Sequence, residues 1–424
     1  MNFFKKITAI GTALSLSLVL VACGSGDQPS PDGSGSDTPP AENVEINYFS
    51  FSANPDYETQ LNDMVAAFEA ENPGIKVKLE LAPYDSYFTK LQTLLAGGTP
   101  PDVYEMNYEN FVSYAAKDVL LDLSELVASD SIDLSKVNET AFKAYQYQGK
   151  QYGMTEAFSN VVTFYNKDLF DKAGIEYPTA EWTWKDEVEA AKKITDAANG
   201  VYGTYSPVTM NEFFKVLAQN GGSIYDADGK LTINAAKNVE ALQYMVDLVL
   251  TDKVTPTPAE MSGQESGDLF LNGKLGMVHT GIWMFGSFKD APFQWDIQVE
   301  AGNTNKATHF FANGLVVDKN TANAEAAYKF AKFMSVGAAA AQIRVDNSWE
   351  LPISTDQTIL DAYLSQTPPS NRQAVFDSLN YLVLPPVTDN WAKLSSDADA
   401  EFQKVLLGEE TPQEALDILQ AKYE

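Results

Sequence analysis

The sequence predicts a large α/β protein. Three observations carry this prediction: strand-like and helix-like patterns alternate along the chain from residue 44, the chain has 424 residues, and 45% of them are hydrophobic. Such a chain can bury a large core, and its length favours two or three domains. Strands that alternate with helices are typical of a sheet whose faces are covered by helices.

The first two strand–helix pairs show the pattern most clearly. Apolar and polar residues alternate over 44–51 and, without exception, over 75–81, which is the period of a half-buried strand. Over 57–71 and 84–95 the apolar residues instead recur every three or four positions, as in an amphipathic helix. A third strand begins at 102–104. Because helices separate these strands, we expect mainly parallel pairing.

The same alternation continues toward the end of the chain. Thr183 and Asp186 form the pattern of a capping box before a helix that runs to about residue 198. Asp228-Gly229 is typical of a tight hairpin turn, and the later bidentate glutamate of a calcium loop is absent. The other predicted elements are strands at 161–165, 223–225, 231–233 and 315–317, and helices at 167–173, 235–250, 323–345 and after a capping box at Thr411.

Charge and composition restrict the partners. Lys and Arg total 29 against 58 Asp and Glu, which gives a formal net charge of −29. A surface this acidic repels phosphate backbones, so we predict no nucleic-acid partner. The arginines are Arg344 and Arg372 alone. Because Arg is the usual bidentate partner of a carboxylate or phosphate, its scarcity favours a neutral ligand.

The first residues form an export and anchoring signal. Lys5 and Lys6 precede an apolar run at 7–21, which is too short to remain as a transmembrane helix. The run ends in Leu-Val-Ala-Cys, which resembles the lipobox of bacterial lipoproteins. This resemblance implies a signal peptide at 1–22 and a lipidated Cys23 that anchors the protein to the membrane.

A segment rich in Gly, Ser, Pro and Asp follows at 23–43. It has almost no apolar residue to bury, so we predict a disordered tether between the lipid and the folded part. The long tether and the acidic chain favour the extracellular face of a Gram-positive cell membrane as the location.

Motifs for catalysis, cofactors and metals are missing. The chain has two histidines and one cysteine, so a disulfide within the chain and a His/Cys-rich metal site are excluded. The serine-hydrolase elbow, the phosphate-binding loop and the dinucleotide-binding glycine motif do not occur. We therefore predict that the protein is not an enzyme and needs no cofactor or metal, and we interpret His279 as a structural residue.

Aromatic residues with short polar neighbours gather where strands are expected to end. They lie at 48–54, 104–108, 281–283 and 348–350. Flat aromatic rings suit the apolar faces of sugar rings, and Asn, Asp and Glu can bind sugar hydroxyls. Because open α/β sheets bind ligands beyond the ends of their strands, this pattern favours a carbohydrate ligand.

An ordered set of short motifs resembles one family. The set comprises Gly-Gly-Thr-Pro-Pro-Asp-Val at 97–103, Tyr-Gly-Met at 152–154, the string from Phe164 to Gly174, Thr183-Trp184, Gln-Asn-Gly-Gly at 219–222, Gly-Lys-Leu-Gly-Met at 273–277 and Leu351-Pro352. Together they are similar to the extracellular solute-binding proteins of ABC importers, in the large branch that mostly binds sugars. The resemblance extends from about 44 to 352, and the residues beyond share only helical character.

The resemblance implies a two-lobed, periplasmic-binding-protein-like fold with a ligand cleft between lobes that are joined by crossing hinge strands. The expected N-terminal lobe is 44–155 with 312–352, and the expected C-terminal lobe is 156–311 with 353–424. The chain would cross near 155–160, return near 308–313 and cross again near 353. Ligand contacts from both lobes would stabilise a closed state that the permease subunits of the importer sense.

The resemblance also implies which residues contact the ligand. By its place in the motifs, Trp283 is the stacking aromatic of the second lobe. The other implied ligand contacts are Ser52, Asn54, Asn107, Glu156, Asn160, Asn313, Trp349 and Glu350. Asp102, Asn166 and Asp168 are implied to hold loops and helix caps together. Met106 stands near the point where malto-oligosaccharide binders carry a tryptophan, which argues against a maltodextrin ligand.

The favoured interpretation is a monomeric lipoprotein that captures a carbohydrate, an oligosaccharide in particular, and delivers it to the permease of an ABC transporter. Two alternatives stay open. A secreted glycosidase with a surface anchor would use two carboxylates in the cleft. The same binding fold could also take a non-sugar solute such as a peptide or a polyol, or an acidic sugar.

Overall fold

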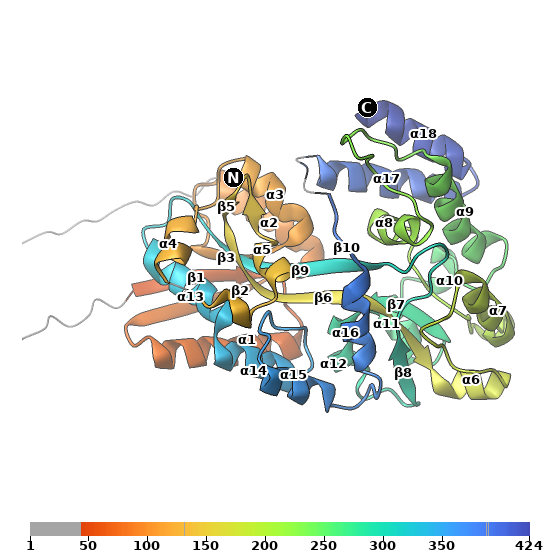
Figure 1. The fold of residues 1–424 in the computed structure, drawn as a ribbon, viewed down its shortest axis with the longest axis horizontal. Coiled ribbons are helices and arrows are strands. Elements are labelled where there is room, and N and C mark those ends of the chain that lie inside the picture. Colours follow the sequence, from red (N-terminus) through yellow and green to blue (C-terminus); the bar gives the residue numbers. More distant parts are fainter. Residues whose placement is uncertain (1–43, 131, 387, 389) are drawn as a thin grey trace, which may run out of the picture. The chain divides into compact units, whose positions relative to one another are not determined.

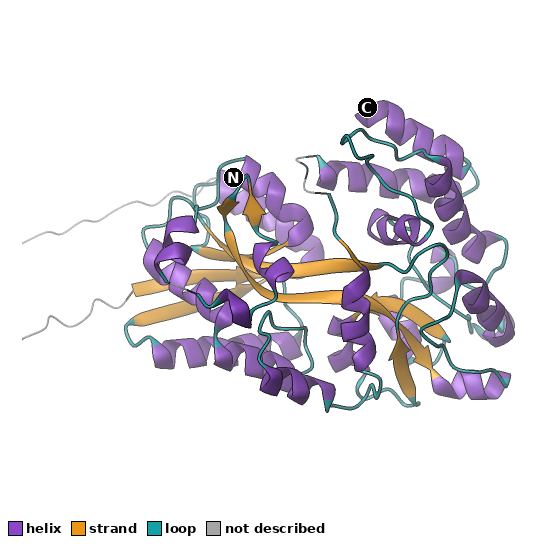
Figure 2. Ribbon diagram, in the orientation of Figure 1, coloured by secondary structure: helices purple, strands orange, loops and turns teal. Residues whose placement is uncertain are grey.

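A computed structural model of the protein describes residues 44–424 apart from 131, 387 and 389. The predicted signal peptide, Cys23 and the tether lie outside the described residues. Within the described part of the chain, no helix has the length and apolar character needed to cross a membrane. Figure 1 follows this part by colour along the sequence, and Figure 2 distinguishes its helices from its strands.

A sheet of eight strands in the order β2-β1-β3-β9-β6-β7, with β10 on β9 and β8 on β6, is the centre of the fold. β1 (Val44–Ser50) runs parallel to both β2 (Ile75–Leu81) and β3 (Val103–Asn107). These strands are connected by α1 (Pro55–Glu71) and α2 (Tyr84–Ala96). This is the strand–helix alternation that the sequence predicts, and parallel pairing follows from the helical crossovers.

Two long strands cross the molecule, β6 (Gly153–Asn166) and β9 (Thr308–Val317), and Figure 2 shows them lying together between the two groups of helices. Residues 313–317 of β9 pair with β3, whereas residues 161–166 of β6 pair with β7 and β8. We call the part built on β1, β2 and β3 the first lobe and the part built on β7 and β8 the second lobe. The crossing strands therefore belong to both lobes.

The expectation of mainly parallel pairing is wrong for this central region. β9 is antiparallel to β3 and β6, and β6 is antiparallel to β7 and β8. The chain leaves the first lobe along β6 and returns along β9, so the neighbouring strands run in opposite directions. Parallel pairing holds among β1, β2 and β3 and between β9 and β10.

Three apolar cores stabilise the fold. The largest covers the first lobe, where α1 and α13 (Ala324–Val336) pack with rings such as Phe68 and Phe330 5.1 Å apart, and it continues along β6. A second core lies among α8, α9, α17 and α18 of the second lobe. The third surrounds Phe170, beside the second-lobe end of β6.

The remaining elements of the described residues, with η for 3-10 helices, are α3 (Tyr108–Ala116), α4 (Ser124–Ser129), η1 (Leu134–Lys136), α5 (Glu139–Lys143), β4 (Gln146–Tyr147), β5 (Lys150–Gln151), α6 (Lys167–Ala173), α7 (Trp184–Ile194), η2 (Ala197–Asn199), α8 (Met210–Gln219), α9 (Ala236–Leu250), α10 (Pro258–Met261), α11 (Ser266–Leu271), β7 (Met277–Gly281), η3 (Ile282–Met284), α12 (Phe285–Phe288), β8 (Trp295–Gln298), α14 (Ala338–Asp346), α15 (Gln357–Leu364), α16 (Gln373–Ser378), η4 (Leu379–Tyr381), β10 (Leu382–Val383), α17 (Trp391–Leu406) and α18 (Pro412–Tyr423).

The single helix predicted at 323–345 is two helices, α13 and α14, separated at Gly337. The backbone of Gly337 is extended, with φ −69° and ψ 128°. A Cβ at this position would lie 2.3 Å from the carbonyl oxygen of Phe333, so the chain can turn here only with a glycine. The capping boxes at Thr183 and Thr411 are confirmed, although α7 ends at Ile194 rather than near 198.

Near the predicted third crossing, the contacts of the chain pass from the first lobe to the second. Ser354 forms a bridge with Val137, and the following helix α15 packs on α14, so these residues still contact the first lobe. Farther along, the Ser370 hydroxyl and the backbone N–H of Asn371 both donate to Asp296 of β8 in the second lobe, the latter at 2.8 Å. Contacts with the first lobe thus continue through Ser354 and α15, and the lobe boundary at 353 stays a prediction.

Candidate functional site

A cavity of about 690 Å³ is lined by residues of both lobes. This size is within the range of small-molecule binding sites. Seven of the nine residues predicted to contact a ligand line it, and they come from loops and strand ends that are far apart in the sequence: Ser52, Asn54, Asn107, Trp283, Asn313, Trp349 and Glu350. The structure brings these seven together; whether they bind a ligand stays a prediction.

The first-lobe residues of the cavity are held by short polar contacts. Ser52 follows β1, and its hydroxyl donates to the buried Glu105 at 3.2 Å. Asn54 caps α1, because its Oδ1 accepts from the backbone N–H of Tyr57 at 2.8 Å. Asn107 ends β3 and donates to the Tyr84 hydroxyl at 2.9 Å. Each polar side chain is thus oriented before any ligand arrives.

Trp283 presents an aromatic ring from the second lobe. It lies in η3 directly after β7, and its ring meets Phe311 edge to face with centroids 5.3 Å apart. Phe311 in turn stacks on His309 at 3.9 Å. A Cβ on Gly281 would lie 1.8 Å from the Trp283 ring, so a glycine is needed to let the indole lie over the backbone. The half-buried ring is therefore fixed in orientation.

Trp349 is held differently, because both faces of its indole are covered. The Tyr57 ring stacks on one face with centroids 4.3 Å apart and an interplanar angle of 10°. The Arg344 guanidinium lies over the ring at 4.5 Å from its centroid. Trp349 therefore turns an edge to the cavity, and Trp283 is the predicted tryptophan that is better placed to stack on a ligand.

A contact between the lobes lies beside this stack. The Tyr57 hydroxyl, from the first-lobe helix α1, donates to the backbone carbonyl of Trp283 in the second lobe at 2.8 Å. The structure thus holds the two lobes together across the cavity.

Buried carboxylates lie in the cavity lining and directly beneath it. Glu350 accepts from the Ser159 hydroxyl at 3.2 Å and from the Asn313 amide at 3.4 Å. Burial raises the pKa of Glu350 to about 7, although the nearby Arg344 opposes this shift. Burial also raises the pKa of Glu105 well above its usual range. In this region a carboxylate is therefore stable in its ionised form only where a partner compensates its charge.

Glu156 and Asn160, predicted to contact the ligand, do not line the cavity. Glu156 is 2% exposed and pairs with Arg344 at 2.5 Å. The Asn160 amide donates to the backbone carbonyl of Val375 at 2.7 Å. Both side chains lie in β6, all of whose residues are buried. Their partners come from distant segments, so in this structure they support the crossing strand instead of facing the cavity.

Sequence reasoning missed several lining residues, of which Glu109 is the most informative. It lies in the first turn of α3, two residues after Asn107. Among the described residues, neither of its carboxylate oxygens has a hydrogen-bond partner. Burial raises its pKa to about 7. An acidic residue in the first helical turn beyond a strand end is the signal that could have identified it. Tyr57, Tyr84, Asn211 and Phe311 also line the cavity.

His279 belongs to an ionic cluster in the second lobe, away from the cavity lining. Its Nε2 lies 2.7 Å from Glu187 and its Nδ1 2.9 Å from Glu300. Lys215 is also buried, and it pairs with Glu300 and with Glu212. These contacts support the structural interpretation of this histidine. Across the residues the structure describes, no group of three or more His, Cys, Asp or Glu side chains is arranged to hold a metal ion.

Comparisons with known proteins give the family. Residues 54–340 match the family described as bacterial extracellular solute-binding protein. The ABC substrate-binding protein Lmo0181 of Listeria monocytogenes, whose structure is in complex with cycloalternan, is 56% identical to this chain. The match covers 90% of this chain and 98% of that one, with a TM-score of 0.87.

Two further relatives are more distant. The arabinooligosaccharide-binding protein of Bacillus subtilis (strain 168) is 29% identical over 253 residues, which are 58% of this chain and 57% of the relative. The GacH receptor of Streptomyces glaucescens, solved with acarbose, is 23% identical with a TM-score of 0.78 over 90% of this chain and 97% of that one, which shows a common fold. The predicted two-lobed α/β fold is confirmed. By the match over residues 54–340 and the 56% identity to a solved substrate-binding protein, this chain belongs to the bacterial extracellular solute-binding proteins of ABC importers.

Proposed function

We propose that the protein captures an oligosaccharide in the 690 Å³ cavity and delivers it to the permease of an ABC importer. The observation that carries the proposal is the pairing of two features in one cavity: the Trp283 ring and the Glu109 carboxylate, whose oxygens lack partners among the described residues. An aromatic ring can cover the apolar face of a sugar, and a carboxylate can accept from its hydroxyls. Names of relatives support the ligand class, since they include arabinooligosaccharide-binding and galactooligosaccharide-binding proteins.

Cycloalternan is the first ligand to test. The relative solved with it shares 56% identity with this chain over nearly the whole of both. That is far above the 21% to 24% identity of other solved binding proteins, such as the maltose-bound protein of T. maritima. The expectation that the ligand is not a maltodextrin also favours cycloalternan over maltose as the first ligand to test.

Capture would proceed by closure of the lobes. Ser52, Asn54 and Asn107 reach the cavity from the first lobe, and Trp283 reaches it from the second. A ligand that contacts both sides favours the closed state in proportion to its contacts there. The crossing strands β6 and β9 are the covalent links about which the lobes would move.

The remaining parts of the proposal concern location and chemistry. Lipidation of Cys23 would hold the binding protein beside the permease, on the extracellular face of a Gram-positive membrane. The protein would act as a monomer and would not alter its ligand. A glycosidase would instead release reducing ends from the sugar, and a sensitive reducing-end assay with the purified protein separates the two functions.

A thermal-shift screen tests the ligand class. Purified protein is heated with cycloalternan, arabino-, galacto- and manno-oligosaccharides, and with mannitol as a polyol. A ligand at about a hundred times its Kd adds about 2.7 kcal/mol to the free energy of unfolding, which raises Tm visibly. We expect a shift with cycloalternan. A protein that melts cooperatively and responds to none of the sugars would contradict the proposal.

A further inference from the structure

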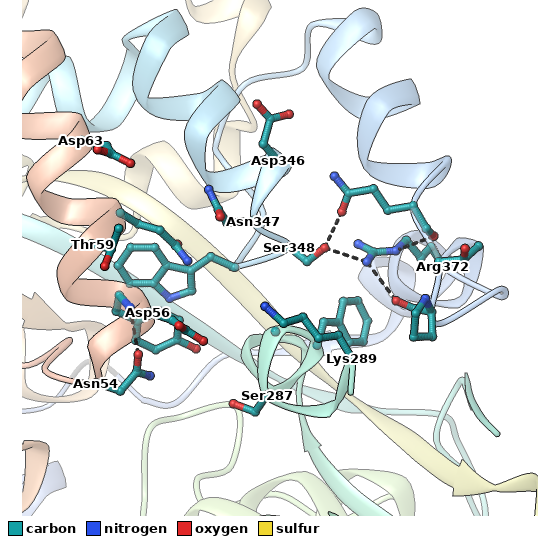
Figure 3. A pocket seen from close by; sticks show the side chains of 18 residues that line it. Asn54, Asp56, Thr59, Asp63, Ser287, Lys289, Asp346, Asn347, Ser348 and Arg372 are labelled. Carbon is teal, nitrogen blue, oxygen red and sulfur yellow. Dashed lines mark hydrogen bonds between the residues drawn. The ribbon is translucent and has the colours of Figure 1, made fainter. Parts of the chain in front are cut away.

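A second hollow, of about 460 Å³, lies directly behind the ligand cavity. We call it the rear hollow. Side chains that line it include Asp56, Asp63, Phe285, Ser287, Lys289 and Asn347. Figure 3 shows Thr59 and Asp63 on α1 at one side, Asn347 after α14 above, and Ser287 and Lys289 at α12 below. Both lobes therefore contribute to it, as they do to the ligand cavity.

Three residues line both spaces: Asn54, Tyr57 and Trp349. The stacked rings of Tyr57 and Trp349 are therefore the partition between the ligand cavity and the rear hollow. Because the two rings are nearly parallel and 4.3 Å apart, they leave no space between them for a sugar ring.

The partition is fixed at several points. The Tyr57 hydroxyl donates to the Trp283 carbonyl at 2.8 Å, and its backbone N–H donates to Asn54 at 2.8 Å. Trp349 is backed by the Arg344 guanidinium, and that group is held by its ion pair with Glu156 at 2.5 Å. Because Tyr57 and Trp349 each have several partners, both side chains are held in one position.

The rear hollow has the chemistry of a sugar site. Its carboxylates, an amide and a hydroxyl can bind sugar hydroxyls. Tyr57 and Trp349 stand between it and the ligand cavity, so its use by a ligand in that cavity depends on the side chain at position 57.

We propose that Tyr57 sets the size of the oligosaccharide that this protein accepts, by closing the ligand cavity from the rear hollow. The proposal rests on the proposed function, because it assigns a length limit to the same carbohydrate site. Removal of the Tyr57 ring joins the two spaces and admits a further sugar unit.

The test compares Tyr57→Ala and Tyr57→Phe with the wild-type protein. Each is titrated calorimetrically with cycloalternan and with a linear ladder of galacto-oligosaccharides of increasing length. Tyr57→Phe keeps the ring and loses only the hydroxyl, so its ranking of ligands should equal that of the wild type. Tyr57→Ala should bind the longest ladder members at least about tenfold more tightly than the wild type does, a gain of about 1.4 kcal/mol.

A second change shows where the gain arises. Ser287 lines the rear hollow but not the ligand cavity, so Ser287→Trp is the change chosen to fill the hollow with a large side chain. It should leave wild-type binding unchanged and cancel the gain in the Tyr57→Ala background. Tyr57→Leu, which keeps apolar packing on Trp349, serves if Tyr57→Ala does not fold.

The outcomes separate the two proposals. A wild-type protein that binds no carbohydrate rejects the proposed function itself. A wild-type protein that binds sugar, with folded Tyr57→Ala and Tyr57→Leu variants that show the same length preference, overturns the role of Tyr57. The role of Tyr57 is also overturned if Tyr57→Ala still binds the longest oligosaccharides more tightly after Ser287→Trp is added.

Discussion

The Arg344 guanidinium covers one face of the Trp349 ring, 4.5 Å from its centroid, while it pairs with the buried Glu156 at 2.5 Å. One side chain of α14 thus fixes both a wall of the ligand cavity and a charge within the crossing strand β6. Removal of one partner of a buried ion pair leaves the other charge unpaired, which costs about 3–5 kcal/mol.

We therefore expect Arg344→Met to lower the free energy of unfolding by about 3–5 kcal/mol in urea melts and to weaken ligand binding as Trp349 loses its support. Lys329→Ala is the matched control, since Lys329 pairs with Glu325 at 2.9 Å on an exposed helix face. That change should cost less than about 0.5 kcal/mol. If both variants lose the same free energy of unfolding, the buried Arg344–Glu156 ion pair stabilises the fold no more than an exposed pair does.

Glu109→Gln should stabilise the protein and weaken its ligand binding. Burial raises the pKa of Glu109 from 4.5 to about 7. The folded state therefore retains a proton that the unfolded state releases, and the wild type loses stability as the pH rises from 4.5 through 7. Glutamine does not titrate, so the variant should be more stable by about 1–3 kcal/mol at pH 8 and by little at pH 4.5.

The sugar hydroxyls proposed to contact Glu109 would favour its ionised form. Wild-type affinity should accordingly rise with pH through about 7, and this rise should be smaller in Glu109→Gln. Glu350, whose pKa is also raised to about 7, faces the same cavity and accounts for the pH dependence that remains. Unchanged affinity and an unchanged pH profile in the variant would remove Glu109 from the site.

His279 should make stability depend on pH in the alkaline range. Burial alone would lower its pKa, but the carboxylates of Glu187 and Glu300 raise it to about 10. Since the folded-state pKa is above the unfolded value, the stability from this group is complete below about 6.5 and is lost as the pH rises through 10. Lys215 lies in the same cluster and stays charged over this range, since its own pKa is raised.

His279→Gln should therefore destabilise the protein by about 2–4 kcal/mol at pH 6, with a difference from wild type that shrinks toward pH 10. Denaturant melts at several pH values give this difference directly. If the variant's loss of unfolding free energy stays constant over the whole pH range, packing and not the charge of the imidazole is responsible.

Cys23→Ala tests the predicted anchor. Without a thiol to lipidate, the exported protein has only its tether at the N-terminus, and it should move from the membrane fraction to the medium. Fractionation of cells that express either form, followed by immunodetection, measures this. A variant that sediments with membranes as fully as the wild type would contradict the lipoprotein interpretation.

The sequence predicts well those elements whose pattern is local. β2 and α6 begin and end at the predicted residues, because one half-buried face fixes the strand period and Gly174 ends the helix. The expected roles of Asp102 and Asn166 also agree with the structure: Asp102 accepts from the backbone N–H of Asn47 at 2.8 Å, and Asn166 caps α6. Such contacts involve short polar side chains beside chain turns, where few alternatives exist.

What the sequence could not predict depends on distant partners. Glu156 meets Arg344 from 188 residues away and Asn160 meets Val375 from 215 residues away, so neither is free for the cavity. The same limit applies to the partition, since nothing local indicates that Tyr57 stacks on Trp349. Pairing direction around β6 likewise follows from the path of the chain between lobes, which no local pattern encodes.

The central claim is that a carbohydrate binds against Trp283, and calorimetric titration of cycloalternan into wild-type and Trp283→Ala protein tests it most directly. We expect one ligand per chain for the wild type. For the variant we expect affinity weaker by about 1–3 kcal/mol, because an aromatic anchor is lost, with Trp283→Phe between the two. A Trp283→Ala protein that melts as the wild type does and binds the sugar with unchanged affinity would contradict the account.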